Sequence, residues 1–308
     1  MQRILVIKLG ALGDFFHAFH AFAAIRAHHP ANHVTLLTTA PFAGIAARAP
    51  WFDAVLVDPR ASWWNMAATW RTVRLIRGFD FVYDLQTSRR SARYFALAGR
   101  PPWSGIAPGC SHPHANPARD SMHTVARQRE QLEMAGVRAF PKPEREWLSQ
   151  GEPPADLAQP AVLLVPGGAG VGSAKRWAAE RYAALAQRLA ASGLHPVIIG
   201  GPDETPIAAQ ISLACPSATN LTGRTTIAGL ATLAASAALV IGNDTGPLHV
   251  LSASGAPAIA LFSASSDEQQ AGPLGPDGQP AVVIAEADLA ALTVDRVLAR
   301  ALELLARG

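Results

Sequence analysis

The sequence lacks most of the patterns that mark metal centres, disulfide-bonded domains and P-loop nucleotide sites. Only two cysteines, Cys110 and Cys215, occur in 308 residues, and neither belongs to a Cys-x-x-Cys pair, which indicates a reducing compartment and no structural metal. No Asp-x-Asp sequence occurs, so a diphosphate held by a metal ion is disfavoured. The Walker A pattern is also absent, which excludes an NTPase of the P-loop class.

The sequence also lacks the features of a membrane-spanning helix and of a secretory signal peptide. Residues 225–243 hold no charged residue over 19 positions, but alanine supplies most of their hydrophobicity. A membrane span needs about 20 strongly apolar residues, so this stretch is predicted to divide into a helix (226–237) and a strand (238–241). The first residues, Met1-Gln2-Arg3, lead straight into a strand-like run and not into a signal peptide. These features predict a cytoplasmic protein, with membrane contact limited to the periphery of the inner membrane.

What the chain does have is a repeated alternation of apolar strand-like runs and helical runs. The run Arg3–Leu9 is apolar almost throughout, as in a strand buried on both faces of a parallel sheet. The alternation stops in the proline-rich stretch 101–147 and restarts at Ala161. We predict strands at 3–9, 33–38, 54–57, 81–85, 161–165, 196–199, 238–241 and 257–262, and helices at 15–28, 41–49, 62–77, 91–97, 121–135, 180–191, 226–237, 250–254 and 292–306, with one more ending near 214.

This alternation predicts two Rossmann-like domains of the α/β class, each with a doubly wound parallel sheet. The segment 150–160 is rich in proline and is typical of an interdomain linker. The domains are therefore expected at 1–150 and 151–308, facing a central cleft, and the C-terminal helix is a candidate to pack back on the first domain. Ligands of such sheets bind at the carboxyl ends of the strands, so the turns that follow the strands are the candidate sites.

The most informative turn is 242–249, Gly-Asn-Asp-Thr-Gly-Pro-Leu-His, between a predicted strand and a predicted helix. Asp244 and Thr245 are residue types that cap helices, and Pro247 suits a first helical turn. The N–H groups of Thr245 and Gly246 are expected to point out of the turn, where unpaired amides and the helix dipole attract anions. The turn is therefore predicted to bind an anion through its backbone.

A second polar turn follows the first strand. Asp14 stands at the start of the next predicted helix, where it can be a helix cap or a general base that faces the second domain. His17 lies one turn later on the same helix face. It is the rival candidate for the base, and otherwise a polar residue at the domain surface.

Two further turns belong to the second half. The Gly-rich loop 166–177 contains Lys175 and Arg176 near its end, two cations that could neutralise a phosphate chain, although it lacks the Gly-x-Gly-x-x-Gly spacing of a dinucleotide site. Asp203 and Glu204 follow the strand at 196–199, where an acid can accept from a ribose hydroxyl or cap a helix. Together these turns predict a nucleotide-diphosphate site in the second domain and a base on the first.

Positive charge is concentrated in the first half of the chain. Residues 1–147 carry 18 Lys and Arg against 10 Asp and Glu, whereas residues 148–308 carry 8 against 13. The stretch 60–100 holds eight arginines and two acids, which favours a phosphorylated substrate or an acidic membrane surface as partner, although any single arginine can belong to a solvated face. No nucleic-acid-binding signature occurs. The histidines of the loop-rich stretch lack the spacing of metal ligands; they are His112, His114 and His123.

Three motifs, in this order, resemble those of the glycosyltransferase family 9 heptosyltransferases, which transfer heptose from ADP-heptose to lipopolysaccharide. They are Arg-Ile-Leu-Val-Ile-Lys-Leu-Gly-Ala-Leu-Gly-Asp at 3–14, Pro166-Gly-Gly with Ala174-Lys-Arg-Trp177, and the turn 242–249 with Gly255-Ala-Pro257. The resemblance covers nearly the whole chain and is weakest over 60–150. It implies the GT-B fold and an inverting transfer that needs no metal and no other cofactor.

The resemblance also implies roles for single residues. Asp14 looks like the base that deprotonates the acceptor hydroxyl, and Lys175 looks like the cation on the donor phosphate. Thr245 and Gly246 would bind the diphosphate through their backbone, with Asp244 near the sugar and Asp203 near the ribose. The expected donor site is completed by Gly167, Gly168, Ser173, Arg176, Pro247 and His249, and the candidates for acceptor binding are His17, Arg60, Arg89 and Arg90.

The sequence therefore predicts a heptosyltransferase-like enzyme with two substrates, a nucleotide-sugar donor and a phosphorylated, lipid-linked saccharide acceptor of the bacterial envelope. Two alternatives stay open. One is a GT-B transferase that uses another nucleotide-sugar on a protein or another glycan, and the other is a catalytically silent nucleotide- or glycan-binding protein. The presence of both Asp14 and Lys175 favours the enzyme.

Overall fold

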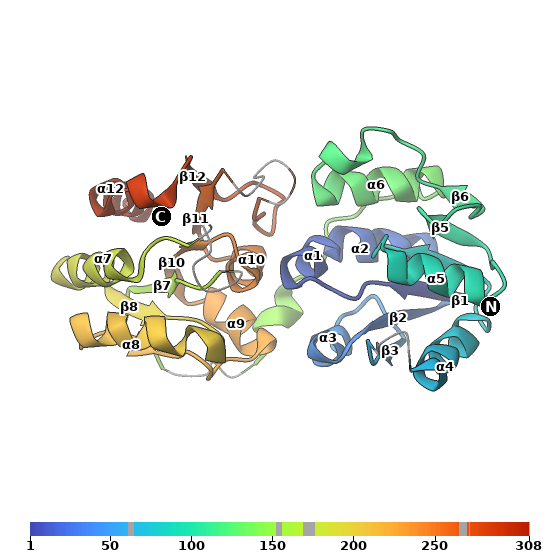
Figure 1. The fold of residues 1–308 in the computed structure, drawn as a ribbon, viewed down its shortest axis with the longest axis horizontal. Coiled ribbons are helices and arrows are strands. Elements are labelled where there is room, and N and C mark those ends of the chain that lie inside the picture. The colour runs from blue at the N-terminus through green and yellow to red at the C-terminus, as the bar shows by residue number, and fades with distance from the viewer. Residues whose placement is uncertain (61–64, 152–155, 169–175, 265–269, 271, 308) are drawn as a thin grey trace. The chain divides into compact units, whose positions relative to one another are not determined.

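The computed structural model describes residues 1–60, 65–151, 156–168, 176–264, 270 and 272–307. The chain divides into two compact units, Met1–Trp147 and Leu148–Gly308, each built on one six-stranded parallel sheet (Figure 1). The prediction of an α/β chain with two doubly wound parallel sheets is confirmed. In the described part of the chain, no helix has the length and apolar character needed to cross a bilayer.

The first unit has the strand order β3-β2-β1-β4-β5-β6. The apolar run predicted as the first strand forms the centre of this sheet, because β1 pairs in parallel with both β2 and β4. The strands are β1 (Arg3–Ile7), β2 (His33–Thr39), β3 (Ala54–Asp58), β4 (Phe81–Asp84), β5 (Trp103–Gly105) and β6 (His112–Pro113). The α-helices are α1 (Leu12–His17), α2 (Phe19–His28), α3 (Ala40–Ala46), α4 (Met66–Ile76), α5 (Arg89–Leu97) and α6 (Thr124–Met134).

The helices of this unit bury their apolar sides in two separate places. Val73 and Ile76 of α4 and Phe95 of α5 share one buried cluster with Leu5 and Ile7 of β1. Phe15 of α1 stacks on Phe42 of α3 at 4.7 Å between ring centroids. The two clusters hold the helices that flank the ends of β1 and β4.

The predictions for the first unit were wrong in two places. The helix predicted at 15–28 is two helices, α1 and α2, interrupted at Ala18, where ψ is −7°. The loop-rich stretch 101–147 contains two strands, β5 and β6, that were not predicted. These strands are three and two residues long, too short to show a periodic pattern.

The second unit repeats the same architecture with the strand order β12-β11-β10-β7-β8-β9. Its strands are β7 (Ala161–Val165), β8 (His195–Ile198), β9 (Thr219–Asn220), β10 (Ala237–Asn243), β11 (Ala258–Ser263) and β12 (Val282–Glu286). Its helices are α7 (Ala179–Ala191), α8 (Thr205–Ala214), α9 (Ile227–Ala234), α10 (Gly246–Ala253) and α12 (Val294–Leu305). Strands β9 and β12 were not predicted, and the centre of the predicted linker, 152–155, lies outside the described residues.

The core of the second unit lies between its sheet and helices α7, α8 and α12. Leu164 and Ile241, from the two central strands, share this core with Tyr182 of α7 and Leu298 of α12. Helix α12 packs against α7 within the unit. The apolar side of the last helix is thus buried against the second sheet's own layer of helices.

Candidate functional site

Each sheet has one point where its strand order reverses direction. Counted along the chain within each unit, both orders read 3-2-1-4-5-6 from one edge to the other. The first strand of each unit therefore lies beside the fourth, β1 beside β4 and β7 beside β10. The connections from these two strands lead to opposite sides, and ligands of open α/β sheets bind in the gap that this leaves at the carboxyl ends.

In the second unit a cavity of about 340 Å³ occupies this position. It is formed by the turns that follow β7, β8 and β10, together with the start of α10. Its lining residues are Val165, Gly167, Gly168, Gly200, Glu204, Asp244, Thr245, Gly246 and Pro247. Six of the residues predicted for the donor site thus line one cavity: Gly167, Gly168, Asp244, Thr245, Gly246 and Pro247.

The start of α10 offers backbone donors to this cavity. Thr245 is the N-cap residue, and Pro247 lies within the first two helical positions as expected. Neither Asp244 nor Thr245 caps the helix through its side chain, because no side-chain cap bond forms there. The carboxylate of Asp244 instead accepts a hydrogen bond from Nε2 of the buried His249, at 3.3 Å. The first-turn amides therefore remain available to an anion.

Asn243, the last residue of β10, joins the two loops that border the cavity. Its side chain is fully buried. Its Nδ2 donates to the carbonyl oxygens of Pro166 (3.0 Å) and Gly167 (2.9 Å). Its Oδ1 accepts from the backbone N–H of Trp177 and from the hydroxyl of Tyr182, both at 3.1 Å. One amide thus fixes both described ends of the Gly-rich loop.

Of the two acids that follow β8, Glu204 lines the cavity, whereas Asp203 is exposed and does not line it. The Oε2 of Glu204 accepts from the N–H of Gly201 at 2.8 Å, and its Oε1 lies 3.5 Å from Nη2 of Arg176. Arg176 also donates from Nη2 to the carbonyl of Gly168 at 2.7 Å. Arg176 therefore braces the walls of the cavity, and Glu204 presents a carboxylate there. The predicted donor residues Ser173 and Lys175 lie outside the described residues.

In the first unit the corresponding position holds charged residues. Asp14 lies in the first turn of α1 and is partly exposed, but the N-cap residue is Ala11. Within the described part of the chain, the Asp14 carboxylate makes no hydrogen bond or ion pair, although it attracts the ammonium group of the buried Lys8. Asp14 is therefore not a helix cap, and its carboxylate is open to a ligand.

Sequence reasoning missed the two charged residues that support this turn. Lys8 directly follows β1 and donates to the carbonyl oxygen of Leu85 at 3.4 Å, and burial lowers its pKa. Asp84 ends β4, and its Oδ1 accepts from the N–H groups of Gln86 and Thr87. Burial raises the pKa of Asp84 to about 6. The sequence signal that could have identified them is a charged residue at the carboxyl end of each apolar strand.

The candidates for acceptor binding fall into different environments. The buried Asp58 accepts from the backbone N–H of Arg60 at 2.7 Å and lies 3.8 Å from Nη1 of Arg90. Arg90 also donates to the hydroxyl of Tyr94, which donates to Asp58 at 2.8 Å. Arg89 is exposed. Asp58, at the end of β3, therefore contacts the backbone of Arg60 and the guanidinium group of Arg90, and Arg60 itself is exposed.

The histidines have structural partners in the same unit. His17 is buried, with its ring centroid 5.2 Å from that of His123. His123 accepts from the N–H of Val125 at the start of α6, and His114 pairs with Glu130 at 2.9 Å. His112 lies 3.0 Å from the hydroxyl of Ser111. No group of three or more His, Cys, Asp or Glu side chains is arranged to hold a metal ion among the described residues.

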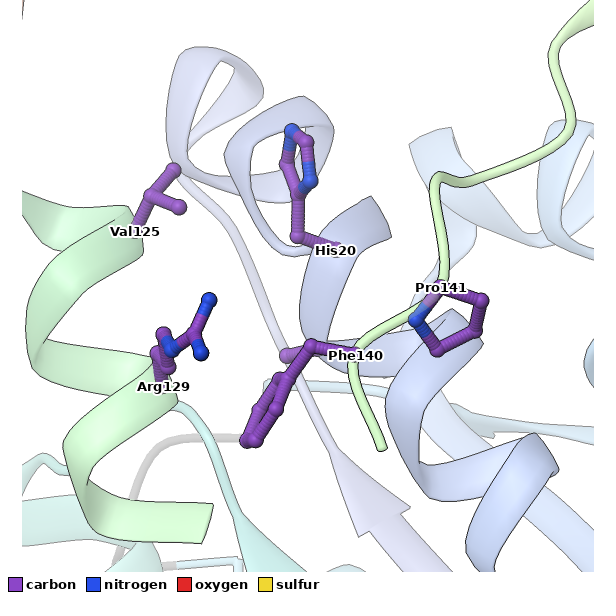
Figure 2. Close-up of a pocket in the computed structure, with 6 residues that line it drawn as sticks. His20, Val125, Arg129, Phe140 and Pro141 are labelled. Atoms are coloured by element: carbon purple, nitrogen blue, oxygen red, sulfur yellow. The ribbon is translucent and has the colours of Figure 1, made fainter. Parts of the chain in front are cut away.

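A second, smaller cavity of about 80 Å³ lies between α2, α6 and the segment at 140–141 (Figure 2). His20 points into it from α2 and Arg129 from α6. Arg129 lies over the ring of Phe140 at 4.5 Å and pairs with Glu133. Burial and Arg145 lower the pKa of His20 to about 4. This cavity is too small to hold a nucleotide.

The chain matches a model of a known protein family. The model of glycosyltransferase family 9 (heptosyltransferase) matches residues 66–289. Among curated proteins, the chain is similar to the lipopolysaccharide core heptosyltransferase OpsX of Haemophilus influenzae. The two are 22% identical over 286 residues, which cover 85% of this chain and 79% of that protein.

Solved structures of the same family share the fold. A glycosyl transferase family 9 protein from Veillonella parvula is 22% identical, has a TM-score of 0.84, and is matched over 100% of this chain and 98% of its own. The Escherichia coli heptosyltransferase WaaC with ADP is 22% identical, with a TM-score of 0.77 over 98% and 99% of the two chains. WaaC has also been solved with ADP-2-deoxy-2-fluoro heptose, at 23% identity, a TM-score of 0.74 and the same coverage. The two six-stranded parallel sheets are thus those of a GT-B-like fold.

Replacing Asn243 should destabilise the second unit. In Asn243→Ala two carbonyl oxygens and one N–H lose their buried partner, which should lower the free energy of unfolding by roughly 2–4 kcal/mol. Tyr182→Phe, the matched control, removes the hydroxyl that donates to Asn243 and, at 3.4 Å, to the carbonyl oxygen of Val165. It leaves the contacts of Asn243 with the loop in place and should cost about 1 kcal/mol. Chemical denaturation of both variants measures the difference. Equal losses in the two variants would contradict the role assigned to Asn243.

Asp84 should give folding stability a negative slope with pH. Its pKa rises from 3.8 to about 6 in the folded protein, so between these values the folded state binds more protons than the unfolded state, and stability falls as pH rises. His20 and His29, whose pKa is lowered to about 4, give the opposite slope. The test is therefore the difference in unfolding free energy between wild type and Asp84→Asn across this window. A difference that does not change with pH would show that Asp84 is not perturbed.

Proposed function

The chain belongs to glycosyltransferase family 9 (heptosyltransferase), and we propose that it transfers a heptose, or a related sugar, from an ADP-sugar to a saccharide of the lipopolysaccharide core or a similar envelope glycan. The family and the GT-B-like fold are the premises. The relative OpsX is a lipopolysaccharide core heptosyltransferase, and WaaC has been solved with ADP and with a fluorinated ADP-heptose.

The observation that carries the proposal is the combination of donors and acceptors in the cavity of the second unit. The start of α10 supplies amides and a positive dipole end for a diphosphate. Glu204 supplies a carboxylate that can accept from the hydroxyls of a ribose. Two glycines, Gly167 and Gly200, allow Glu204 to lie this close to the loops. A Cβ atom at Gly167 would lie 3.1 Å from Cδ of Glu204, and one at Gly200 would lie 2.8 Å from its Cβ. A nucleoside diphosphate fits this arrangement of charge and hydrogen bonding.

The departing diphosphate needs stabilisation as the bond from the anomeric carbon to the phosphate oxygen breaks. The uncapped first turn of α10 supports this role because its amides are preorganised around the developing charge. Lys175, assigned by the family resemblance, would add one positive charge. Asp244 would stand beside the transferred sugar, held by its contact with His249.

Asp14 is the proposed general base. It takes the proton of the acceptor hydroxyl while that oxygen attacks the anomeric carbon, and ADP leaves from the opposite face, so the configuration is inverted. Two observations support Asp14 over His17: its carboxylate is partly exposed and has no hydrogen-bond or ion-pair partner among the described residues, whereas the His17 side chain is buried against His123.

The proposed acceptor is a phosphorylated, lipid-linked saccharide. The proposed contacts for its anionic groups are the exposed Arg60 and Arg89 and the partly exposed Arg90, which lies against Asp58. A lipid-linked acceptor would bring the enzyme to the periphery of the inner membrane from the cytoplasm.

Replacing the proposed base should separate catalysis from donor binding. Asp14→Asn keeps the size of the side chain but cannot accept a proton, so kcat should fall by roughly 10²–10⁴-fold, with ADP affinity within a factor of about two of wild type. Asp120→Asn, which changes a largely exposed aspartate of the same unit, should leave both unchanged. Turnover and ADP titration measure the two quantities. Full activity of Asp14→Asn would remove the residue from this role.

A thermal-shift panel of ADP-, GDP- and UDP-sugars, followed by mass analysis of the product, tests the proposed function itself. A specific donor present at 100 times its Kd stabilises the protein by roughly 2.7 kcal/mol, so ADP-heptose should give the largest shift. Glu204→Gln should shrink that shift, whereas Glu180→Gln, an exposed acid in the same unit, should not. A larger shift with another nucleotide-sugar would replace the donor, and binding without sugar transfer would favour a catalytically silent protein.

A further inference from the structure

We propose that one face of the first unit docks onto an anionic lipid surface. This α4–α5 face consists of Trp70 and Arg74 from α4, its C-cap residue Arg77, and Arg93 and Leu97 from α5. The inference deepens the proposed function, because a lipid-linked acceptor is met at a membrane. Its test measures lipid binding without sugar transfer, so the two can fail separately.

Helix α4 is divided lengthwise into a buried and an exposed side. Val73 and Ile76 are buried in the core, whereas Trp70, Arg74 and Arg77 are exposed. The exposed three are spaced four and three residues apart, so they form one stripe along the helix. Trp70 keeps 45% of its surface exposed, which is a large apolar area to leave in water.

Helix α5 is divided in the same way. Tyr94 and Phe95 are buried, while Arg93 and Leu97, one turn apart, are exposed. Leu97 keeps 40% of its surface exposed. Helices α4 and α5 pack against each other.

Arg77 connects the two stripes. Its guanidinium carbon lies 5.7 Å from the centroid of the Trp70 ring, and its Nη2 donates to the carbonyl oxygen of Leu97 at 2.8 Å. The exposed indole of α4, the arginine and the end of α5 are therefore in contact. The apolar side chains thus lie among the cations and not apart from them.

The charge of this face is not neutralised by the protein. Residues 66–100 contain seven arginines and two acids. One acid, Asp84, is buried, and the other, Asp80, accepts from the backbone N–H of Arg3. Among the described residues, Arg74 and Arg93 form no ion pair, in contrast to Arg90, which lies against Asp58. Arg90 therefore lies against a carboxylate, whereas Arg74 and Arg93 belong to the exposed α4–α5 face.

An anionic bilayer surface is the partner that satisfies both halves of this chemistry. Arginine side chains attract acidic headgroups, each by about 1 kcal/mol near such a surface. An exposed indole and a leucine gain free energy when they enter the boundary between headgroups and acyl chains. A soluble anion would neutralise the arginines but leave Trp70 and Leu97 in water.

Vesicle co-sedimentation of the whole protein tests the proposal, with vesicles of phosphatidylcholine alone and of phosphatidylcholine mixed with phosphatidylglycerol. Wild type should bind the mixed vesicles, and bind the neutral ones far less. The double variant Arg74→Gln/Arg93→Gln should bind the mixed vesicles roughly thirtyfold more weakly, since about 1 kcal/mol is lost at each position. Trp70→Ala should bind more weakly with an unchanged salt dependence.

The matched control is Arg188→Gln/Arg224→Gln, which removes two exposed arginines of the second unit and should bind like wild type. Thermal unfolding checks that each variant folds. If both double variants lost the same amount of vesicle binding, binding would depend only on the net charge of the protein, and the proposal would be overturned. Binding of wild type to RNA or heparin that vesicles do not displace would also overturn it. If the protein bound vesicles but transferred no sugar, the proposed function would be wrong, and the assignment of the α4–α5 face to lipid binding would stand.

Discussion

The cavity of the second unit depends on how closely two parallel strands approach each other. A Cβ atom at Gly242 would lie 2.6 Å from the Cβ of Val165, so β10 can run this near β7 only because residue 242 has no side chain. The close approach brings the next residue, Asn243, within reach of the loop that follows β7. The amide of Asn243 then sets where that loop begins and, through the N–H of Trp177, where its described part resumes.

The two units place different chemistry at the same topological position. Asp84 ends β4 and Asn243 ends β10, and each is the last residue of the fourth strand in its unit. Both side chains are fully buried. The carboxylate of Asp84 stands near the ammonium of Lys8, whereas the amide of Asn243 is neutral and can both donate and accept. The first unit thus places a charged pair, Lys8 and Asp84, near Asp14. The second unit places an uncharged amide beside the proposed diphosphate site.

The fold was predictable because the long strands are apolar and the turns between them are polar. What could not be predicted were strands such as β6 and β9, which are two residues long and exist because a neighbouring strand offers them hydrogen bonds. The turns of the donor site were predictable from their place after strands. The choice between Asp203 and Glu204 was not predictable, because it depends on a hydrogen bond that the N–H of Gly201 donates to the Glu204 carboxylate. Lys8 and Asp84 were missed because their proximity arises only when β1 pairs with β4.

The uncapped start of α10 has a consequence for how stability is distributed between the free and the bound protein. A threonine at the N-cap position normally contributes about 1 kcal/mol by bonding to the first-turn amides, and Thr245 does not do so. The free protein therefore lacks that stabilisation at one helix end, and the diphosphate of the proposed donor would supply it by binding the same amides. The proposed function thus implies that substrate binding and resistance to unfolding are coupled at this helix. A sequence optimised for stability alone would fill the position with a capping side chain and would compete with its own ligand.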